Sequence, residues 1–320
     1  MTLVERSAID AAARTIEGVA VRTPLLPAPW LARQIGAAEV RLKCENLQHA
    51  GAFKIRGAYN MIARLSEAER AKGVITYSSG NHGQAVALAA RSFKVPALVV
   101  MPTTAPSIKV EGAKKFGAEV VLEGTTSTHR YHKAVEIAEQ RGLAMIPPFD
   151  HADIIAGQGT VGREILEDWS EVETVLVPIG GGGLMSGISA YIKQTQPRVK
   201  VIGVEPENAD AMYRSLEAGS LVTIESKPTI ADGLMPVRPG ELTFEHAQAF
   251  LDQIVRVTDD AIRDAARALL VNSKLVVEFS GAATVAALTS GAYKSNGHIV
   301  AVLSGGNLEP ARAAELLNTT

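Results

Sequence analysis

The chain has 320 residues, 47% of them apolar and 21% charged, a length typical of roughly two domains. Its 32 basic side chains nearly balance 34 acidic ones, which argues against a nucleic-acid-binding protein. The lone Cys44 excludes an internal disulfide and a cysteine-based zinc site. The N-terminus lacks the apolar run of a signal peptide, and no apolar run approaches a membrane span, so we expect a cytoplasmic protein without membrane contact.

Short β-branched runs alternate with segments of helical spacing, the pattern of an α/β fold in which mostly parallel sheets are covered by helices. Strands are expected at Val74–Tyr77, Leu98–Met101, Val120–Glu123, Ala144–Ile146, Thr174–Ile179, Val201–Glu205, Val255–Thr258 and Ile299–Leu303. Helices are expected at Gly83–Phe93, Thr128–Arg141, Ile155–Trp169 and Asp259–Asn272. Several strands lack polar alternation, so both of their faces should be buried.

The domain boundary is predicted at a proline pair. The strands from Val74 to Ile146 could close as a small α/β lobe, and Pro147 and Pro148 then break regular structure. We therefore expect a small domain at residues 74–146 and a larger, discontinuous domain made of residues 1–73 and 147–320.

Four glycines, Gly180 to Gly183, follow the strand that ends at Ile179 and precede a helical stretch. A tight turn needs only one or two glycines, whereas four can expose consecutive N–H groups to an anion at a helix N-terminus. The spacing fits neither a Walker loop nor the dinucleotide pattern, which argues against a nicotinamide-dependent oxidoreductase. We expect a phosphate that does not belong to a standard nucleotide.

Polar residues also follow two other predicted strands. Ser78 to Gly83 reads Ser-Ser-Gly-Asn-His-Gly and would suit a carboxylate or polar ring substituents, although a serine or asparagine here could be only a helix cap. Ser304 to Asn307 is a second glycine-rich turn beside a hydroxyl. Between apolar neighbours, Lys54 stands close to a probable helix start. Most lysines are surface charges, but this setting could lower the amine pKa and favour Schiff-base chemistry.

Together these segments resemble the fold-type II pyridoxal phosphate enzymes, specifically the threonine/serine dehydratase (ammonia-lyase) and serine racemase family. The resemblance is carried by Lys43 to Gln48, Ala52 to Ala58, Ser78 to Gln84, Ile155 to Thr160, the tetraglycine, Ala231 to Gly233 and Ser304 to Asn307. It implies a two-lobed, tryptophan synthase β-like fold, bound pyridoxal 5'-phosphate and a homodimer.

The resemblance implies roles for the cofactor-binding residues. Lys54 would bind the cofactor covalently, Phe53 would pack beside its ring, and Ser304 would bond the ring nitrogen. The remaining cofactor contacts would come from Asn81, Gly180, Gly181, Gly182, Gly183, Leu184 and Glu278. The small domain would be mobile and would hold the substrate carboxylate through Ser78, Ser79, Gly80, Asn81 and His82.

The implied reaction is α,β-elimination. A 3-hydroxy amino acid of the threonine or serine type would lose its Cα proton to Lys54 and then its β-hydroxyl, giving a 2-oxo acid and ammonia. Phe149 and Phe279 suggest a larger β-substituent, as in phenylserine. Ser79, as a second acid/base, leaves serine racemisation open, and β-replacement synthesis is a further alternative. His129 and His132, on one helix face, could favour 3-hydroxyaspartate or form only a solvated face.

A cation site is implied only in part. In the family a glutamate, a backbone carbonyl and an aspartate hold the metal ion, and Glu205 and Ala209 match the first two. Ala211 stands where the aspartate is expected, and losing a charged oxygen ligand weakens a hard divalent site. We therefore expect a weak divalent site or a monovalent ion.

Overall fold

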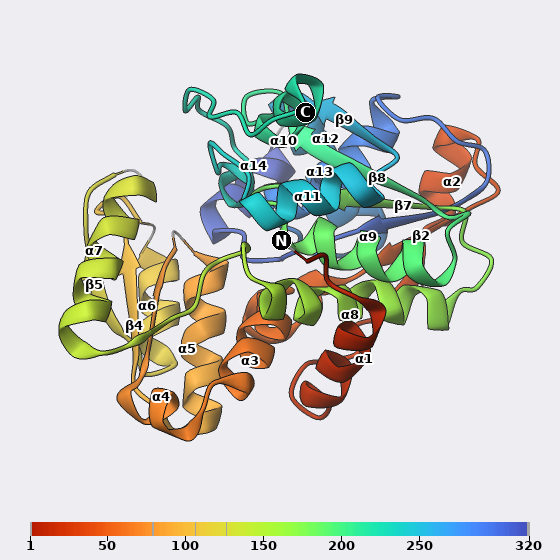
Figure 1. Ribbon diagram of the computed structural model, residues 1–320. Helices are drawn as coiled ribbons and strands as arrows, with labels where there is room; N and C mark the ends of the chain where they lie inside the picture. Colours follow the sequence, from red (N-terminus) through yellow and green to blue (C-terminus); the bar gives the residue numbers. More distant parts are fainter. Residues whose placement is uncertain (1, 79, 106, 126, 319–320) are drawn as a thin grey trace.

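The computed structural model describes residues 2–78, 80–105, 107–125 and 127–318, and these form two α/β lobes (Figure 1). Each lobe is built around one sheet, with helices on both faces. The predicted fold class, mostly parallel sheets covered by helices in two lobes, is confirmed. No helix within these ranges combines the length and apolarity that crossing a membrane requires.

The larger sheet has six strands in the order β1-β2-β10-β7-β8-β9. Its strands are β1 (Leu25–Pro27), β2 (Glu39–Lys43), β7 (Thr174–Pro178), β8 (Lys200–Pro206), β9 (Gln253–Val257) and β10 (His298–Val302). Only the short edge strand β1 runs antiparallel to its neighbour. Since the other strands are parallel, the loops that follow them meet at one edge of the sheet.

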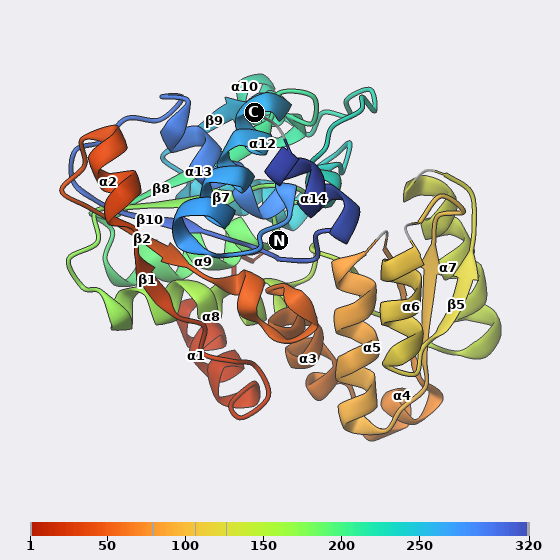
Figure 2. The same cartoon turned by 180° about the vertical axis from the view of Figure 1, so that it is seen from behind.

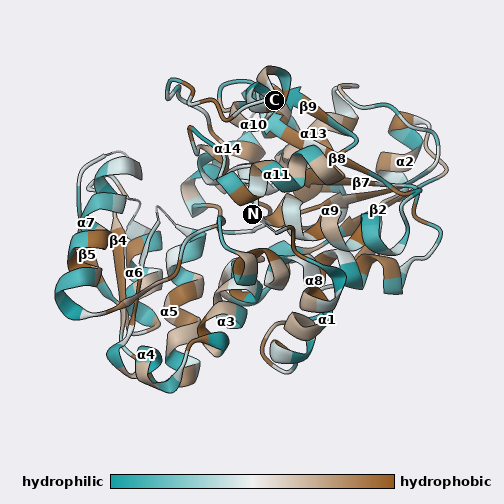
Figure 3. Ribbon diagram, viewed as in Figure 1, coloured by the Kyte–Doolittle hydropathy of each residue, from teal (hydrophilic) through white to brown (hydrophobic). Residues whose placement is uncertain are grey.

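The smaller sheet has four parallel strands in the order β5-β4-β3-β6. They are β3 (Val74–Tyr77), β4 (Ala97–Met101), β5 (Glu119–Leu122) and β6 (Ala144–Met145). The central strand β4 is buried along its whole length, and Figure 3 shows it in the hydrophobic colour. This agrees with the absence of polar alternation in its sequence.

Fourteen α-helices occur in the described ranges, and they are α1 (Arg6–Thr15), α2 (Pro29–Ile35), α3 (Lys54–Arg64), α4 (Glu67–Lys72), α5 (Asn81–Phe93), α6 (Ser107–Lys115), α7 (Ser127–Arg141), α8 (Ala152–Asp168), α9 (Gly183–Thr195), α10 (Ala211–Ala218), α11 (Glu241–Phe250), α12 (Asp259–Ala268), α13 (Phe279–Thr289) and α14 (Pro310–Asn318). Helices α1, α8, α9 and α11 pack on one face of the large sheet. Helices α2, α12 and α13 pack on the other, which Figure 2 shows from behind.

Helix α3 is held by unusually close helix packing. A β-carbon on Gly157 of α8 would lie 2.5 Å from the carbonyl oxygen of Arg56 in α3. Likewise, a β-carbon on Gly187 of α9 would lie 2.4 Å from the backbone nitrogen of Gly159. Only glycine permits backbones to approach so closely, and the three helices therefore form a rigid support for the first turn of α3.

All eight predicted strands are present, with ends shifted by one or two residues. The strands β1 and β2 were not predicted, because β1 is only three residues long and β2 mixes charged with apolar residues. The helix predicted at Asp259–Asn272 is wrong at its end: α12 stops at Ala268, and a single π-helical turn follows at Leu269–Ser273. Lys274 ends that turn in the left-handed conformation.

Candidate functional site

Lys54 is the first residue of α3, and its neighbours tie it to the turn after β10. The backbone N–H of Phe53 donates to the carbonyl of Ser304 at 3.2 Å, and Ala52 forms an isolated bridge with Gly305. Two segments separated by about 250 residues are thus joined by backbone contacts. The predicted neighbourhood of Lys54 and Ser304 is therefore present in the structure.

A buried ionic cluster fixes α3 from the other side. Arg56, fully buried, bonds both oxygens of Glu45 at 2.8 and 2.9 Å and also reaches Glu164 at 2.6 Å. Lys43 adds a second cation to Glu164 at 2.6 Å. Because each buried charge has a partner, the cluster holds the strand β2, the helix α3 and the helix α8 in one arrangement. Lys43 and Glu45 belong to one of the segments that carry the family resemblance and Arg56 to another, so these two segments share a structural role.

The amine of Lys54 lies in a dry environment. Its Nζ donates to the carbonyl of Pro148 at 2.7 Å and lies 5.0 Å from the centre of the Phe53 ring. The side chain as a whole keeps some exposure, but burial of its amine lowers the pKa to about 8. The uncharged form of the amine is therefore more populated near neutral pH than in an ordinary lysine, which favours a Schiff-base nucleophile.

The tetraglycine forms the loop between β7 and α9. Gly182 adopts a left-handed conformation with φ of 96° and precedes the first residue of the helix, Gly183. Within the described ranges, no hydrogen bond uses the N–H groups of residues 181–184, while the carbonyl of Gly181 accepts from the Thr243 hydroxyl at 2.8 Å. The loop thus offers several donors at a helix N-terminus, as phosphate binding requires.

Phe149 lies directly against this loop. A β-carbon on Gly181 would lie 2.1 Å from Cδ1 of the Phe149 ring, so only glycine fits there. The next residue, Asp150, accepts the N–H groups of the first turn of α11 at 2.9 to 3.2 Å. The segment that begins at Pro147 therefore passes between Lys54 and the tetraglycine.

Asn81 connects the small-sheet lobe with the turn after β10. Its side-chain amide donates to Glu278 at 2.6 Å, and its Oδ1 accepts from Asn307 at 2.9 Å. Glu278 is buried, and burial together with the charge of Asp232 raises the pKa of its carboxyl to about 7. The structure brings Asn81 and Glu278 together as a pair, which the sequence could not show.

His82, the second residue of α5, is also buried at the site. Its Nε2 lies 3.0 Å from the carbonyl of Ile146, and its Nδ1 has no hydrogen-bond partner among the described residues. Burial, followed by the nearby charge of Lys54, lowers the pKa of His82 to about 3. The imidazole is therefore neutral, and one ring nitrogen is left for a further polar group.

The rest of the predicted carboxylate loop is only partly described. The hydroxyl of Ser78 accepts the N–H of Gly80 at 3.1 Å, which is a local turn contact. A β-carbon on Gly80 would lie 2.9 Å from Cδ of Lys109. Ser79, predicted as a second acid/base, lies outside the described residues.

Lys109 was missed by the sequence analysis. This buried lysine of α6 forms an ion pair with Asp232, which lies between β8 and α11. Like the pair formed by Asn81 and Glu278, it joins the small-sheet lobe to the large-sheet lobe. Nothing in the spacing of α6 distinguishes this lysine from its exposed neighbours Lys114 and Lys115, so its role depends on tertiary structure.

The residues that resembled a cation site do not fit one. Both oxygens of Glu205 accept backbone N–H groups, from Met212 at 3.0 Å and Tyr213 at 2.8 Å. Asp210, the possible substitute for the missing aspartate, is paired with Arg214 at 2.7 Å and Arg256 at 3.0 Å. The described residues contain no group of three His, Cys, Asp or Glu that could hold a metal ion.

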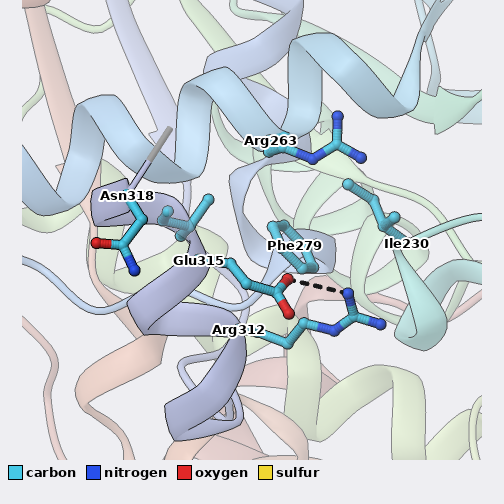
Figure 4. A pocket seen from close by; sticks show the side chains of 7 residues that line it. Ile230, Arg263, Phe279, Arg312, Glu315 and Asn318 are labelled. Atoms are coloured by element: carbon cyan, nitrogen blue, oxygen red, sulfur yellow. Dashed lines mark hydrogen bonds and ion pairs between the residues drawn. The ribbon is translucent and has the colours of Figure 1, made fainter. Parts of the chain in front are cut away.

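A separate cavity of about 360 Å³ lies away from Lys54, between α12, α13 and α14 (Figure 4). Phe279 forms its back wall, with Arg263 and Arg312 at its sides. Phe279 therefore faces this cavity and the core beneath α13. We place the candidate site at Lys54 rather than in this cavity, because among the described residues a low-pKa amine and unpaired N–H groups meet only there.

The comparison with protein families shows to which family the chain belongs. Residues 16–305 match the family model described as pyridoxal-phosphate dependent enzyme. The chain belongs to this family. The expected cofactor, pyridoxal phosphate, agrees with this membership, and the resemblance found in the sequence is confirmed.

Individual relatives show which members of the family the chain resembles. The chain is 46% identical over 310 residues to an L-threonine ammonia-lyase of Thermotoga maritima, covering 97% of this chain and 77% of the relative. It is 39% identical to an L-threo-3-hydroxyaspartate ammonia-lyase of a Pseudomonas species, covering 96% of each. The structure of maize serine racemase superposes with a TM-score of 0.94 at 36% identity, covering 99% and 97% of the two chains. As the sequence analysis expected, the similarity is to lyases and racemases within the family.

Proposed function

We propose that this enzyme eliminates the β-hydroxyl of a 3-hydroxy amino acid, with L-threonine as its main substrate, and releases a 2-oxo acid and ammonia. The observation that carries the proposal is the buried amine of Lys54, with its pKa of about 8, near the unpaired N–H groups of the tetraglycine and the turn of Ser304. The similarity to an L-threonine ammonia-lyase at 46% identity supports this choice of substrate.

The residues present fit pyridoxal phosphate. Residues 181–184 offer N–H donors to a phosphate at the N-terminus of α9, and Lys54 offers an amine whose pKa is lowered to about 8. Phe53 supplies an apolar wall beside that amine, and Ser304 lies next to it through the backbone of Phe53. When bound, the cofactor supplies an electron-withdrawing ring that stabilises the negative charge formed at Cα.

Side chains of this chain carry out the proton transfer and bind the substrate. Lys54, once displaced by the substrate amine, accepts the Cα proton as a neutral base. The β-hydroxyl takes up a proton and leaves as water, and hydrolysis of the elimination product then consumes one water and gives the 2-oxo acid and ammonia. His82 is neutral at working pH and donates its Nε2–H to the Ile146 carbonyl, so its Nδ1 accepts one hydrogen bond from the substrate without adding a second cation beside Lys54. Ser78 and Gly80, with Ser79 between them, complete the carboxylate-binding loop in this proposal.

We further propose that residues 74–146 form a mobile domain that closes over the substrate, while residues 1–73 and 147–320 hold the cofactor. Two polar contacts, between Asn81 and Glu278 and between Lys109 and Asp232, support this arrangement because they join the lobes at the site. Closure would exclude water from the reacting groups. We also propose a homodimer that works in the cytoplasm, to be tested by light scattering and cell fractionation.

The nearest alternative substrate is 3-hydroxyaspartate, favoured by the similarity to a 3-hydroxyaspartate ammonia-lyase. His129 and His132, the side chains considered for its second carboxylate, are both exposed on α7. Phe149 instead places an apolar ring at the site, which suits the methyl group of threonine or a larger apolar substituent such as that of phenylserine. A threonine substrate is therefore the stronger proposal.

Product analysis tests the proposal directly. Purified enzyme supplied with pyridoxal phosphate should produce 2-oxobutanoate from L-threonine with a higher kcat/KM than it shows for 3-hydroxyaspartate or phenylserine. Borohydride reduction followed by peptide mass spectrometry should place the cofactor on Lys54, and Lys54→Ala should abolish turnover. A faster reaction with 3-hydroxyaspartate would overturn the substrate, and racemisation of L-serine faster than its elimination would overturn the reaction type.

A further inference from the structure

An ionic cluster with two buried carboxylates and two partly exposed guanidinium groups lies beneath the tetraglycine, where β8, β9 and the start of α10 meet. Asp210 is 2% exposed and receives the guanidinium of Arg256 at 3.0 Å. A second guanidinium, from Arg214 one helical turn along α10, reaches the other carboxylate oxygen at 2.7 Å. Arg214 binds within its own helix, whereas Arg256 comes from β9, so of the two arginines only Arg256 joins the sheet to the helix.

Glu205 completes this cluster at the N-terminus of α10. Its two oxygens accept the N–H groups of Met212 and Tyr213 in the first turn of α10. The guanidinium of Arg256 also lies 4.2 Å from the centre of the Tyr213 ring. Both carboxylates are therefore committed to protein donors, and a cation would have to displace a guanidinium or two backbone N–H groups.

The cluster is connected to the proposed phosphate site through Met212. A β-carbon on Gly182 would lie 2.9 Å from the terminal methyl of Met212, so this side chain packs directly under the tetraglycine. The backbone N–H of the same residue is held by Glu205. The position of α10 therefore determines how the tetraglycine is supported.

We propose that Arg256 acts as a built-in cation, neutralising Asp210 and holding α10 under the tetraglycine, so that stability and cofactor affinity do not depend on a divalent ion. The location corresponds to the family cation site considered in the sequence analysis, whose third ligand is replaced here by Ala211. A metal ion bound by Asp210 would meet the like charge of Arg256, which already lies 3.0 Å from that carboxylate, and this is unfavourable. Arg256 is thus a positioning residue that acts on the cofactor through Met212.

The first test compares Arg256→Met with the matched control Arg214→Met in the pyridoxal-phosphate-loaded enzyme. Melting temperatures are measured in EDTA and in millimolar Mg²⁺, Ca²⁺ or Mn²⁺, and cofactor affinity is measured by absorbance titration. We expect no cation effect on the wild type, and for Arg256→Met a fall of roughly 2–4 °C with roughly tenfold weaker cofactor binding. Arg214→Met should change the melting temperature and the cofactor affinity much less. Arg256→Lys, which keeps the positive charge, should have values close to those of the wild type.

The second test asks whether removing Arg256 opens a cation site. Ala211→Asp alone should bind no Ca²⁺ or Mn²⁺ by calorimetry, since Arg256 remains in place, whereas Ala211→Asp combined with Arg256→Met should bind. Cation-dependent melting or cofactor affinity in the wild type would overturn the proposal, as would equal effects of Arg256→Met and Arg214→Met. If Arg256→Met does not fold, the wild-type cation titration and the Ala211→Asp variant still decide it. None of these readouts depends on which amino acid is the substrate.

Discussion

The side-chain amide of Asn81 donates to the carboxylate of Glu278 at 2.6 Å, and this contact joins the first residue of α5 to the residue that precedes α13. A β-carbon on Gly305 would lie 2.2 Å from the same carboxylate oxygen. The turn after β10 therefore has room for the Glu278 carboxylate only because residue 305 is a glycine. The pair therefore lies where the small-sheet lobe meets the turn that carries Ser304.

Replacing Glu278 should change how stability depends on pH. Burial raises its pKa from about 4.5 to about 7, so between these values the folded protein binds more protons than the unfolded one. The contribution of Glu278 to stability is therefore full below pH 4.5 and is lost as the pH rises through about 7. Glu278→Gln should flatten this decline. The free energy of unfolding, measured from urea titrations between these pH values, checks it.

The control for this prediction is Glu136→Gln on α7, an exposed carboxylate whose pKa is lowered by Lys133. It should leave the slope between pH 4.5 and 7 essentially unchanged. Glu205, whose pKa burial raises to about 8, contributes a slope of the same sign, so Glu278→Gln should reduce the decline without removing it. An unchanged slope in Glu278→Gln would contradict the assignment.

Removing Arg56 should destabilise the enzyme strongly. Arg56→Met leaves Glu45, which is fully buried, without its main counter-charge, and losing one partner of a buried pair costs about 3–5 kcal/mol. The exposed pair of Arg22 with Glu167 offers a control, and Arg22→Met should cost about 0–1 kcal/mol. Urea denaturation of both variants measures the difference. Similar losses for the two would show that the cluster does not hold α3 as described.

Substituting Gly181 should weaken cofactor binding. The new β-carbon of Gly181→Ala would lie 2.1 Å from the Phe149 ring, so the ring or the loop must move. We expect pyridoxal phosphate affinity to fall at least roughly tenfold, since a displaced loop no longer presents its N–H groups in register. Adding Phe149→Ala removes the overlap and should restore part of the affinity. Absorbance titration of both variants is the measurement, and full affinity in Gly181→Ala alone would refute this account.

The sequence predicted those parts of the site that follow from local pattern. The tetraglycine and the polar turn at Ser304 come directly after strands, where parallel sheets collect ligands, and Lys54 was placed by its position beside a helix start. The pairing of Asn81 with Glu278 and that of Lys109 with Asp232 could not be predicted, because each joins residues more than a hundred positions apart. Phe149 was noted as a residue near the site, but its contact with Gly181 depends on how the segment after Pro148 crosses the opening.

The expectation of a weak cation site considered only the possible ligands and not the positive charges that lie near them in the fold. Glu205 and Ala209 stand at the expected positions, yet the charge that faces Asp210 comes from Arg256, on a strand about fifty residues later. The sequence alone could not show that the charge of Arg256 takes the place of a cation, because Arg256 comes near Asp210 only through the pairing of β8 with β9.

The ion pair of Lys109 with Asp232 should control closure of the two lobes. Lys109→Gln removes the charge that reaches across from α6, and Asp232 then loses its only cationic partner among the described residues. We expect kcat/KM for threonine to fall roughly tenfold, mainly through KM, because the closed arrangement that holds the substrate becomes less populated. Lys133→Gln, which breaks an exposed pair with Glu136 on α7, should leave kcat/KM unchanged. Steady-state kinetics at low and moderate salt measure both, and the wild type should lose activity with salt more steeply than Lys109→Gln. Equal kinetics for wild type and Lys109→Gln would show that this pair has no part in closure.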